Sequence, residues 1–183
     1  MPKGAKHHLI RAGFVNMALS KEQTLEERAR DASSSDKIVL AVLHQRPSRT
    51  TSIQKLGLLV RAAVEGRVPP GYNPHFFGGF DDDIDSSLEE LREEGYIFEG
   101  ADGTFALSPS GVELTSRYLS DATSQKIKET SEKIVGRMVH LSDRDILAIA
   151  YEMFPELTDR SLIRDRVHPI RRVKNAQVIT IPR

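Results

Sequence analysis

The segment 81–107 constrains the fold more than any other part of the chain. Its first half is acidic and repeats apolar residues at the three- and four-residue spacing of a helix with one buried face: Ile84, Leu88 and Leu91. Gly95 is a helix stop, and two short β-prone stretches, 96–99 and 104–107, then flank an Asp-Gly turn. The segment therefore predicts a helix whose apolar stripe joins a core, followed directly by a two-stranded hairpin.

Capping and breaking residues predict further helices on both sides of this segment. The expected helices run from Asp36 to Pro47, from Thr50 or Thr51 to Gly66, from Ser108-Pro109 to Leu119, over 123–140, from Ser142 to Pro155, and briefly from Thr158. A polar helix is expected over 21–32, with a hinge at the serine run 33–35. Residues 66–80 carry strong turn signals, and 75–77 are expected to form a short strand.

The order helix, helix, helix, hairpin, helix resembles that of winged-helix regulators of the MarR and PadR kinds, chiefly over 88–97 and 107–114. The resemblance implies a mainly α (α+β) fold, with a winged helix-turn-helix-like domain that carries a two-stranded wing, followed by a small helical C-terminal extension. The boundaries expected are an N-terminal extension over 1–35, the winged-helix-like domain over 36–120, the helical extension over 121–168 and a basic tail over 169–183. Residues 1–16 are expected to be a ragged extension or an over-long gene start.

Two features differ from a simple DNA-binding helix-turn-helix. In that motif about 3–4 residues join the second and third helices, whereas here 66–80 intervene. The third helix would enter the DNA groove, yet 81–94 contains eight acidic residues and one basic residue. Because DNA affinity depends on Lys and Arg meeting phosphates, like charges at such an interface would cost on the order of several kcal/mol.

A second resemblance accounts for both departures. The Gln-Lys-Leu sequence at 54–56, the aromatic and glycine-rich stretch 76–80 and the following acidic helix are similar to the Panacea (antitoxin SocA-like) domain and its uncharacterised prokaryotic relatives. Residues 149–158 also look like the end of such relatives, while Gly79 stands where proline is usual. The resemblance implies a regulatory or toxin-neutralising module rather than an enzyme, and a protein as the binding partner.

The net charge of zero conceals charge clusters that suggest two different macromolecular partners. A protein partner is favoured, with an antitoxin-like or adaptor role, and the candidate binding residues are Asp82, Glu89, Glu90 and Glu93. The alternative is a DNA-binding transcriptional regulator, which would use Arg46, Arg49, Lys55, Arg171, Arg172 and Lys174. A second copy of the chain is a further candidate partner. The aromatic residues Tyr72, Phe76, Phe77 and Phe80 are expected in the core, with a partner-binding patch as the alternative.

Composition and motifs argue against several other classes. No cysteine is present, so no disulfide is expected and the reducing cytoplasm is the expected compartment. No apolar run approaches the roughly 18 residues of a membrane span. Neither a dinucleotide-binding glycine motif nor a nucleophile elbow occurs, so no cofactor or catalytic residue is expected, and an uncharacterised enzyme is the second alternative. Asp81, Asp83 and Asp85 resemble the start of a calcium loop, but Ser86 and Arg92 occupy its glycine and glutamate positions, so no metal is expected.

Overall fold

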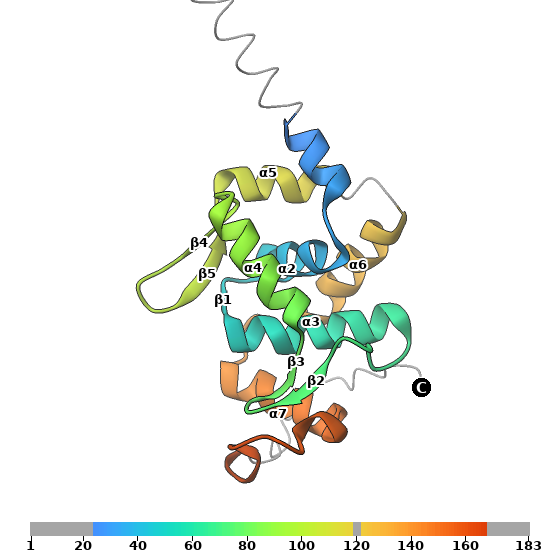
Figure 1. The fold of residues 1–183 in the computed structure, drawn as a ribbon, viewed down its shortest axis with the longest axis vertical. Helices are drawn as coiled ribbons and strands as arrows, with labels where there is room; N and C mark the ends of the chain where they lie inside the picture. The colour runs from blue at the N-terminus through green and yellow to red at the C-terminus, as the bar shows by residue number, and fades with distance from the viewer. Residues whose placement is uncertain (1–23, 119–121, 168–183) are drawn as a thin grey trace, which may run out of the picture.

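Two central helices, α2 and α3, organise the structure, a computed structural model that describes residues 24–118 and 122–167 (Figure 1). The described part is mainly helical with a small antiparallel sheet. Residues 24–31 are helical, and the other helices are α2 Ser34–Gln45, α3 Thr50–Glu65, α4 Asp82–Glu93, α5 Pro109–Tyr118, α6 Ala122–Ile134 and α7 Asp143–Met153, with single 3₁₀ turns η1 Gly136–Met138, η2 Pro155–Thr158 and η3 Arg164–Arg166. The strands are β1 Ser48–Arg49, β2 Asn73–His75, β3 Gly78–Phe80, β4 Ile97–Glu99 and β5 Thr104–Leu107. None of the helices described is long and apolar enough to span a membrane.

The strands form two separate antiparallel groups. The β4–β5 hairpin predicted from the sequence is confirmed, and β1, which links α2 to α3, adds to its free edge in the order β1-β5-β4. Ile97 and Phe105 are buried in the same core as α3 and α4, as expected. The second group is the β2–β3 hairpin, which lies between α3 and α4 along the chain. His75 ends β2, so the short strand expected at 75–77 is wrong: Phe76 and Phe77 lie at the turn, and Gly78 continues the chain with φ +80°.

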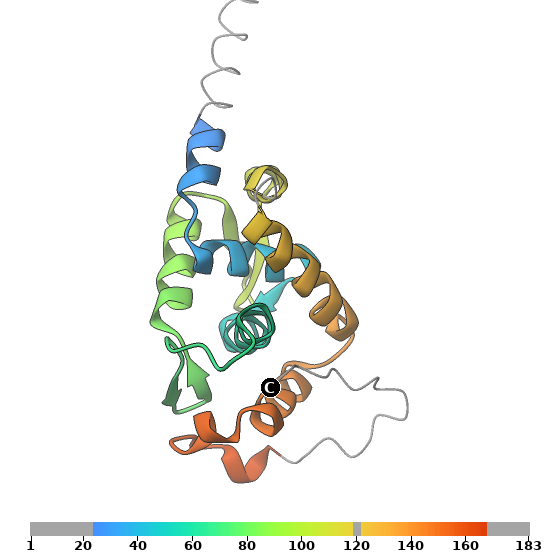
Figure 2. The ribbon, with the colours of Figure 1, turned by 90° about the vertical axis from the view of Figure 1, so that its right-hand side faces the viewer.

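The core is one continuous cluster of buried side chains. Every helix of the described chain contributes to it except the surface turn η3. The core extends from Leu25 to Leu157. Helix α6 packs on both α2 and α3, and α7 packs on α3. Figure 2 shows α4 and α6 on opposite sides of the α2–α3 centre. Residues 122–158 therefore share one core with 34–118, and α4 keeps one face outside.

Several predicted helix boundaries are wrong by a few residues, because the residues that cap or end the helices differ from those expected. The serine run is no hinge, since Ser33 caps α2 and Asp36 completes a capping box from the third helical position. Helix α3 begins directly after β1, and neither Thr50 nor Thr51 caps it. The helix expected over 123–140 ends at Ile134, before η1, and Thr158 ends η2 rather than starting a helix.

Truncating the buried stripe of α4 should destabilise the whole fold. Leu88 is 4% exposed within the common core, so Leu88→Ala should lower the free energy of unfolding by about 2–5 kcal/mol, through lost burial and the cavity left behind. Chemical denaturation followed by circular dichroism measures this. Asp82→Asn, on the exposed side of the same helix, is the control and should stay within about 0.5 kcal/mol of the parent. Equal stabilities for Leu88→Ala and the parent would show that this stripe is not part of the core.

Candidate functional site

Helix α4 presents an acidic face to solvent. Its buried side is a stripe of four residues, Ile84, Ser87, Leu88 and Leu91. The four acidic residues predicted to bind a partner all lie outside this stripe and are exposed: Asp82, Glu89, Glu90 and Glu93. The three acidic residues of the first turn also meet the positive end of the helix dipole, which lowers the cost of gathering them there. The sequence placed these residues correctly on the surface, and their binding role stays a prediction.

Few cations neutralise this face. Arg92 pairs with Glu89 and lies 4.0 Å from Glu99, and Arg28 pairs with Glu94 at 2.7 Å. Within 24–118 and 122–167, none of Asp82, Glu90 and Glu93 has an ion-pair partner within 4.0 Å. The face therefore keeps carboxylates whose charge is available to a partner.

The β4–β5 hairpin continues the acidic surface. It projects from the body of the molecule (Figure 1) and carries Glu99 and Asp102, both exposed. Hydrogen bonds from the hydroxyl and backbone N–H of Thr104 lower the pKa of Asp102, with a smaller contribution from the charge of Arg49. Over 81–107 there are ten acidic residues and one basic residue, so the formal charge of helix plus hairpin is −9.

Asp81 fixes where α4 begins. It is only 1% exposed, and one carboxylate oxygen caps the helix by accepting the N–H of Asp83 at 2.9 Å. The other carboxylate oxygen accepts a hydrogen bond from Arg61, which also donates to the Ser35 hydroxyl at 3.2 Å. The carboxylate that would start a calcium loop is therefore already committed to a helix cap and an ion pair. No cluster of three potential metal ligands occurs among the residues that the structure describes.

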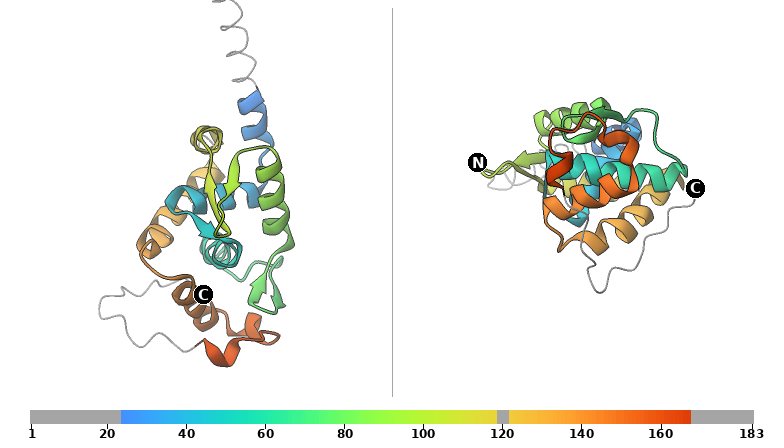
Figure 3. Two further views of the ribbon diagram at one scale, coloured as in Figure 1. Left: turned by 90° about the vertical axis from the view of Figure 1, so that its left-hand side faces the viewer. Right: turned by 90° about the horizontal axis from the view of Figure 1, so that it is seen from below.

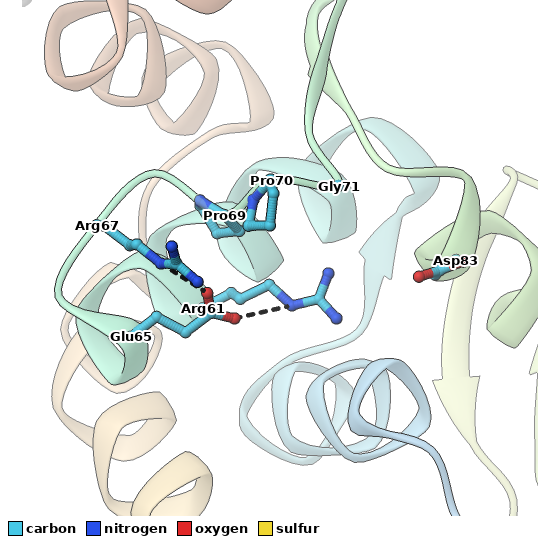
Figure 4. A pocket seen from close by; sticks show the side chains of 7 residues that line it. All are labelled: Arg61, Glu65, Arg67, Pro69, Pro70, Gly71 and Asp83. Carbon is cyan, nitrogen blue, oxygen red and sulfur yellow. Dashed lines mark ion pairs between the residues drawn. The ribbon is translucent and has the colours of Figure 1, made fainter.

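A shallow depression adjoins this ion pair (Figure 4). Its volume is about 540 Å³, and its lining includes Arg61, Glu65, Arg67, the Pro69-Pro70 turn and Asp83. Glu65 lies between the two arginines, 3.7 Å from Arg61 and 3.8 Å from Arg67. Positive and negative side chains here balance each other, so the depression has no excess charge with which to attract an ion.

The three predicted basic residues that the structure describes, Arg46, Arg49 and Lys55, differ in their exposure and contacts. Lys55 is 2% exposed rather than on the surface, and it donates a hydrogen bond to the Gly79 carbonyl at 2.6 Å. Arg46 donates to the carbonyls of Met138 and Leu141, at 3.0 and 2.9 Å, and so holds the chain after α6 against the end of α2. Arg49 is exposed on β1. Arg171, Arg172 and Lys174 lie outside the described residues.

The tip of the β2–β3 hairpin carries an exposed apolar patch, which we define as Phe76, Phe77 and Leu162. Their exposed fractions are 54%, 48% and 71%. Tyr72 is buried as expected, whereas the expectation that Phe76 and Phe77 lie in the core is wrong. Leu162 was not predicted at all. It joins the patch because its backbone N–H donates a hydrogen bond to the Phe76 carbonyl at 3.0 Å. The two residues are 86 positions apart, so no local sequence pattern predicts this contact.

Comparison of the chain with protein-family models, curated proteins and solved structures finds no match. The resemblance to the Panacea domain and to MarR- and PadR-type regulators therefore depends on the sequence motifs alone.

The buried ammonium of Lys55 should make stability depend on pH. Burial lowers its pKa from 10.5 to about 8, so between these values the unfolded chain binds a proton that the folded chain has released. The free energy of unfolding should therefore rise with pH in this window, by about 2 kcal/mol from pH 8 to 10 for this group. Urea denaturation of the parent and of Lys55→Met across that range gives the difference in their free energies of unfolding at each pH. The contributions of titratable groups common to both proteins cancel in this difference. Parallel curves for the two proteins would contradict the lowered pKa of Lys55 in the folded chain.

Proposed function

We propose that the chain is a non-catalytic regulatory protein with a winged-helix-like domain, and that it binds a protein partner through the acidic face of α4 and the β4–β5 hairpin. The partner presents a basic surface. The role is that of an antitoxin-like protein or an adaptor, in keeping with the resemblance to the Panacea domain.

The connectivity supports a winged-helix-like domain. A short strand lies between α2 and α3, α4 leads directly into a hairpin, and the strand order is β1-β5-β4. In this comparison α4 occupies the place of the third helix and β4–β5 that of the wing. The β2–β3 hairpin replaces the short turn of a helix-turn-helix, and it is anchored to α3 through Lys55 and Gly79.

The negative charge of α4 and the β4–β5 hairpin is the main support for a protein partner. The helix and wing that would approach DNA bear a formal charge of −9, and the acidic side chains of α4 point to solvent. Two of the described residues offered for DNA binding, Arg46 and Lys55, are used inside the fold. A basic protein surface complements this face, whereas phosphates repel it.

Neutralising the acidic face should slow association with the partner. The test variant combines Asp82→Asn, Glu90→Gln and Glu93→Gln, all on the exposed side of α4. Partners are captured from a native lysate with and without nuclease, and the association rate of the captured protein is then measured against salt. The rate at low salt should fall about tenfold or more in the variant, because electrostatic steering is lost.

The matched control carries the same change in net charge elsewhere. Glu129→Gln, Glu152→Gln and Glu156→Gln alter three exposed acids on α6, α7 and η2. This variant should capture the partner as the parent does. If both variants bind equally well, or if capture disappears after nuclease treatment, the acidic face is not the protein-binding surface.

A further inference from the structure

The backbone beside the apolar patch packs closely on the C-terminal part of the described chain. A Cβ atom on Gly78 would lie 2.5 Å from the Tyr151 ring, and one on Gly79 would lie 2.8 Å from Leu157, so the hairpin backbone packs tightly on α7 and η2. The Tyr151 hydroxyl also hydrogen-bonds Ser161 at 2.6 Å, next to Leu162. Figures 2 and 3 show the hairpin against the C-terminal helical turns. These contacts place the backbone on either side of the patch, and the three apolar side chains are exposed there, as at interface anchors.

Acidic residues lie a short distance from this patch along the chain. Strand β3 leads from the tip through Asp81 into the first turn of α4, where three acids are exposed: Asp82, Asp83 and Asp85. Asp82 lies five positions after Phe77. A segment that covers both features needs apolar side chains at one end and cations at the other, about 16 Å apart if the intervening chain is extended.

We propose that the chain's own residues 168–183 cover this surface, with their cations on the first turn of α4 and their β-branched segment on the apolar patch. The cations are Arg171, Arg172 and Lys174, and the β-branched segment is 178–181. Ile179 lies five positions after Lys174, the same interval as that between Asp82 and Phe77 in the opposite chain direction.

The position at which the described chain ends favours this occupant. Val167 follows Leu162 of the patch by five residues, and the Arg166 carbonyl accepts a hydrogen bond from Arg144 on α7. Val178 lies eleven positions after Val167, and an extended chain of eleven steps can span about 36 Å. The tail therefore begins five positions after a residue of the patch, it complements the surface in charge and in apolar character, and its attachment to the same chain gives it a high effective concentration.

Covering the first turn of α4 also has a regulatory consequence, which rests on the proposed function. The tail and a basic partner would compete for Asp82, so partner binding would require the tail to leave. Combining Arg171→Gln, Arg172→Gln and Lys174→Gln should then raise the partner's association rate above that of the parent. The docking of the tail itself needs no partner and is tested without one.

The absence of cysteine allows the tail to be located in the full chain with a single spin label. A nitroxide is attached to Thr180→Cys or to Asn175→Cys, and the backbone amide signals of the ¹⁵N-labelled protein are recorded by NMR. The label at 180 should remove most of the intensity of signals from 75–79, and the label at 175 should do the same for 82–86. A label at Ala101→Cys on the β4–β5 turn, exposed, is the control and should leave 75–79 sharp.

Two further samples decide the outcome. Adding Val178→Ser, Ile179→Ser and Ile181→Ser to the Asn175→Cys or Thr180→Cys protein should restore the hairpin signals to at least half of their unlabelled intensity. Spin-labelled protein without ¹⁵N, mixed with unlabelled ¹⁵N protein, should cause no broadening. Uniform or absent broadening in the labelled chain would overturn the proposal, and broadening in the mixed sample would overturn it in favour of a second copy. Either result leaves the partner-binding experiment, which uses other variants, to be judged separately.

Discussion

The buried pairing between Gln54 and Asp81 sets the position of everything that faces a partner. The Gln54 amide donates to the Asp81 carbonyl and accepts the Asp81 N–H, both at 3.0 Å, and both residues are 1% exposed. Where a short turn would otherwise join two helices, this side chain pins the end of the β2–β3 hairpin to α3. If it were lost, a buried N–H and a buried carbonyl would each lack a partner, at about 1–3 kcal/mol apiece.

At the start of α4, one buried carboxylate is ion-paired, whereas the acidic side chains that follow it are exposed to solvent. Asp81 is buried and is neutralised by Arg61, which also links α3 to Ser35 in α2. The acids that follow point outward, and the positive end of the α4 dipole offsets only those of the first turn. Glu90 and Glu93 lie beyond that turn, where repulsion between them disfavours folding. Because this face does not stabilise the fold, we propose recognition of a basic partner as its role.

Elements with a local signature were predictable from the sequence. The stripe through Leu88, the stop at Gly95 and the hairpin around the Asp-Gly turn follow from spacing and turn chemistry, and the structure has all three. The exposure of the α4 acids follows from the same periodicity. These features depend on residues that are close together in the chain, so the local sequence pattern is enough to predict them.

Features that depend on distant contacts were not predictable in the same way. Lys55 was assigned to the surface because lysine usually lies there, yet β3 folds over it and supplies the Gly79 carbonyl. The sequence did contain a signal, because the apolar spacing of α3 leaves little room for a solvent face. In the structure, residues 52–60 of α3 are buried without interruption. Phe76 and Phe77 were expected inside because aromatic residues usually are, but the tight contact of Gly78 with Tyr151 turns the hairpin tip outward.

Binding of the full chain to duplex DNA tests most directly whether α4 and its hairpin are a protein-binding rather than a DNA-binding surface. Fluorescence anisotropy with a mixed-sequence duplex is measured from low to physiological salt. With a formal charge of −9 on helix and hairpin, we expect a dissociation constant no tighter than the roughly 10⁻⁴ M end of non-specific binding at physiological salt. A dissociation constant below about 10⁻⁶ M, with binding that weakens steeply with salt and is lost in Arg49→Ala, would show that this is a DNA-binding surface instead.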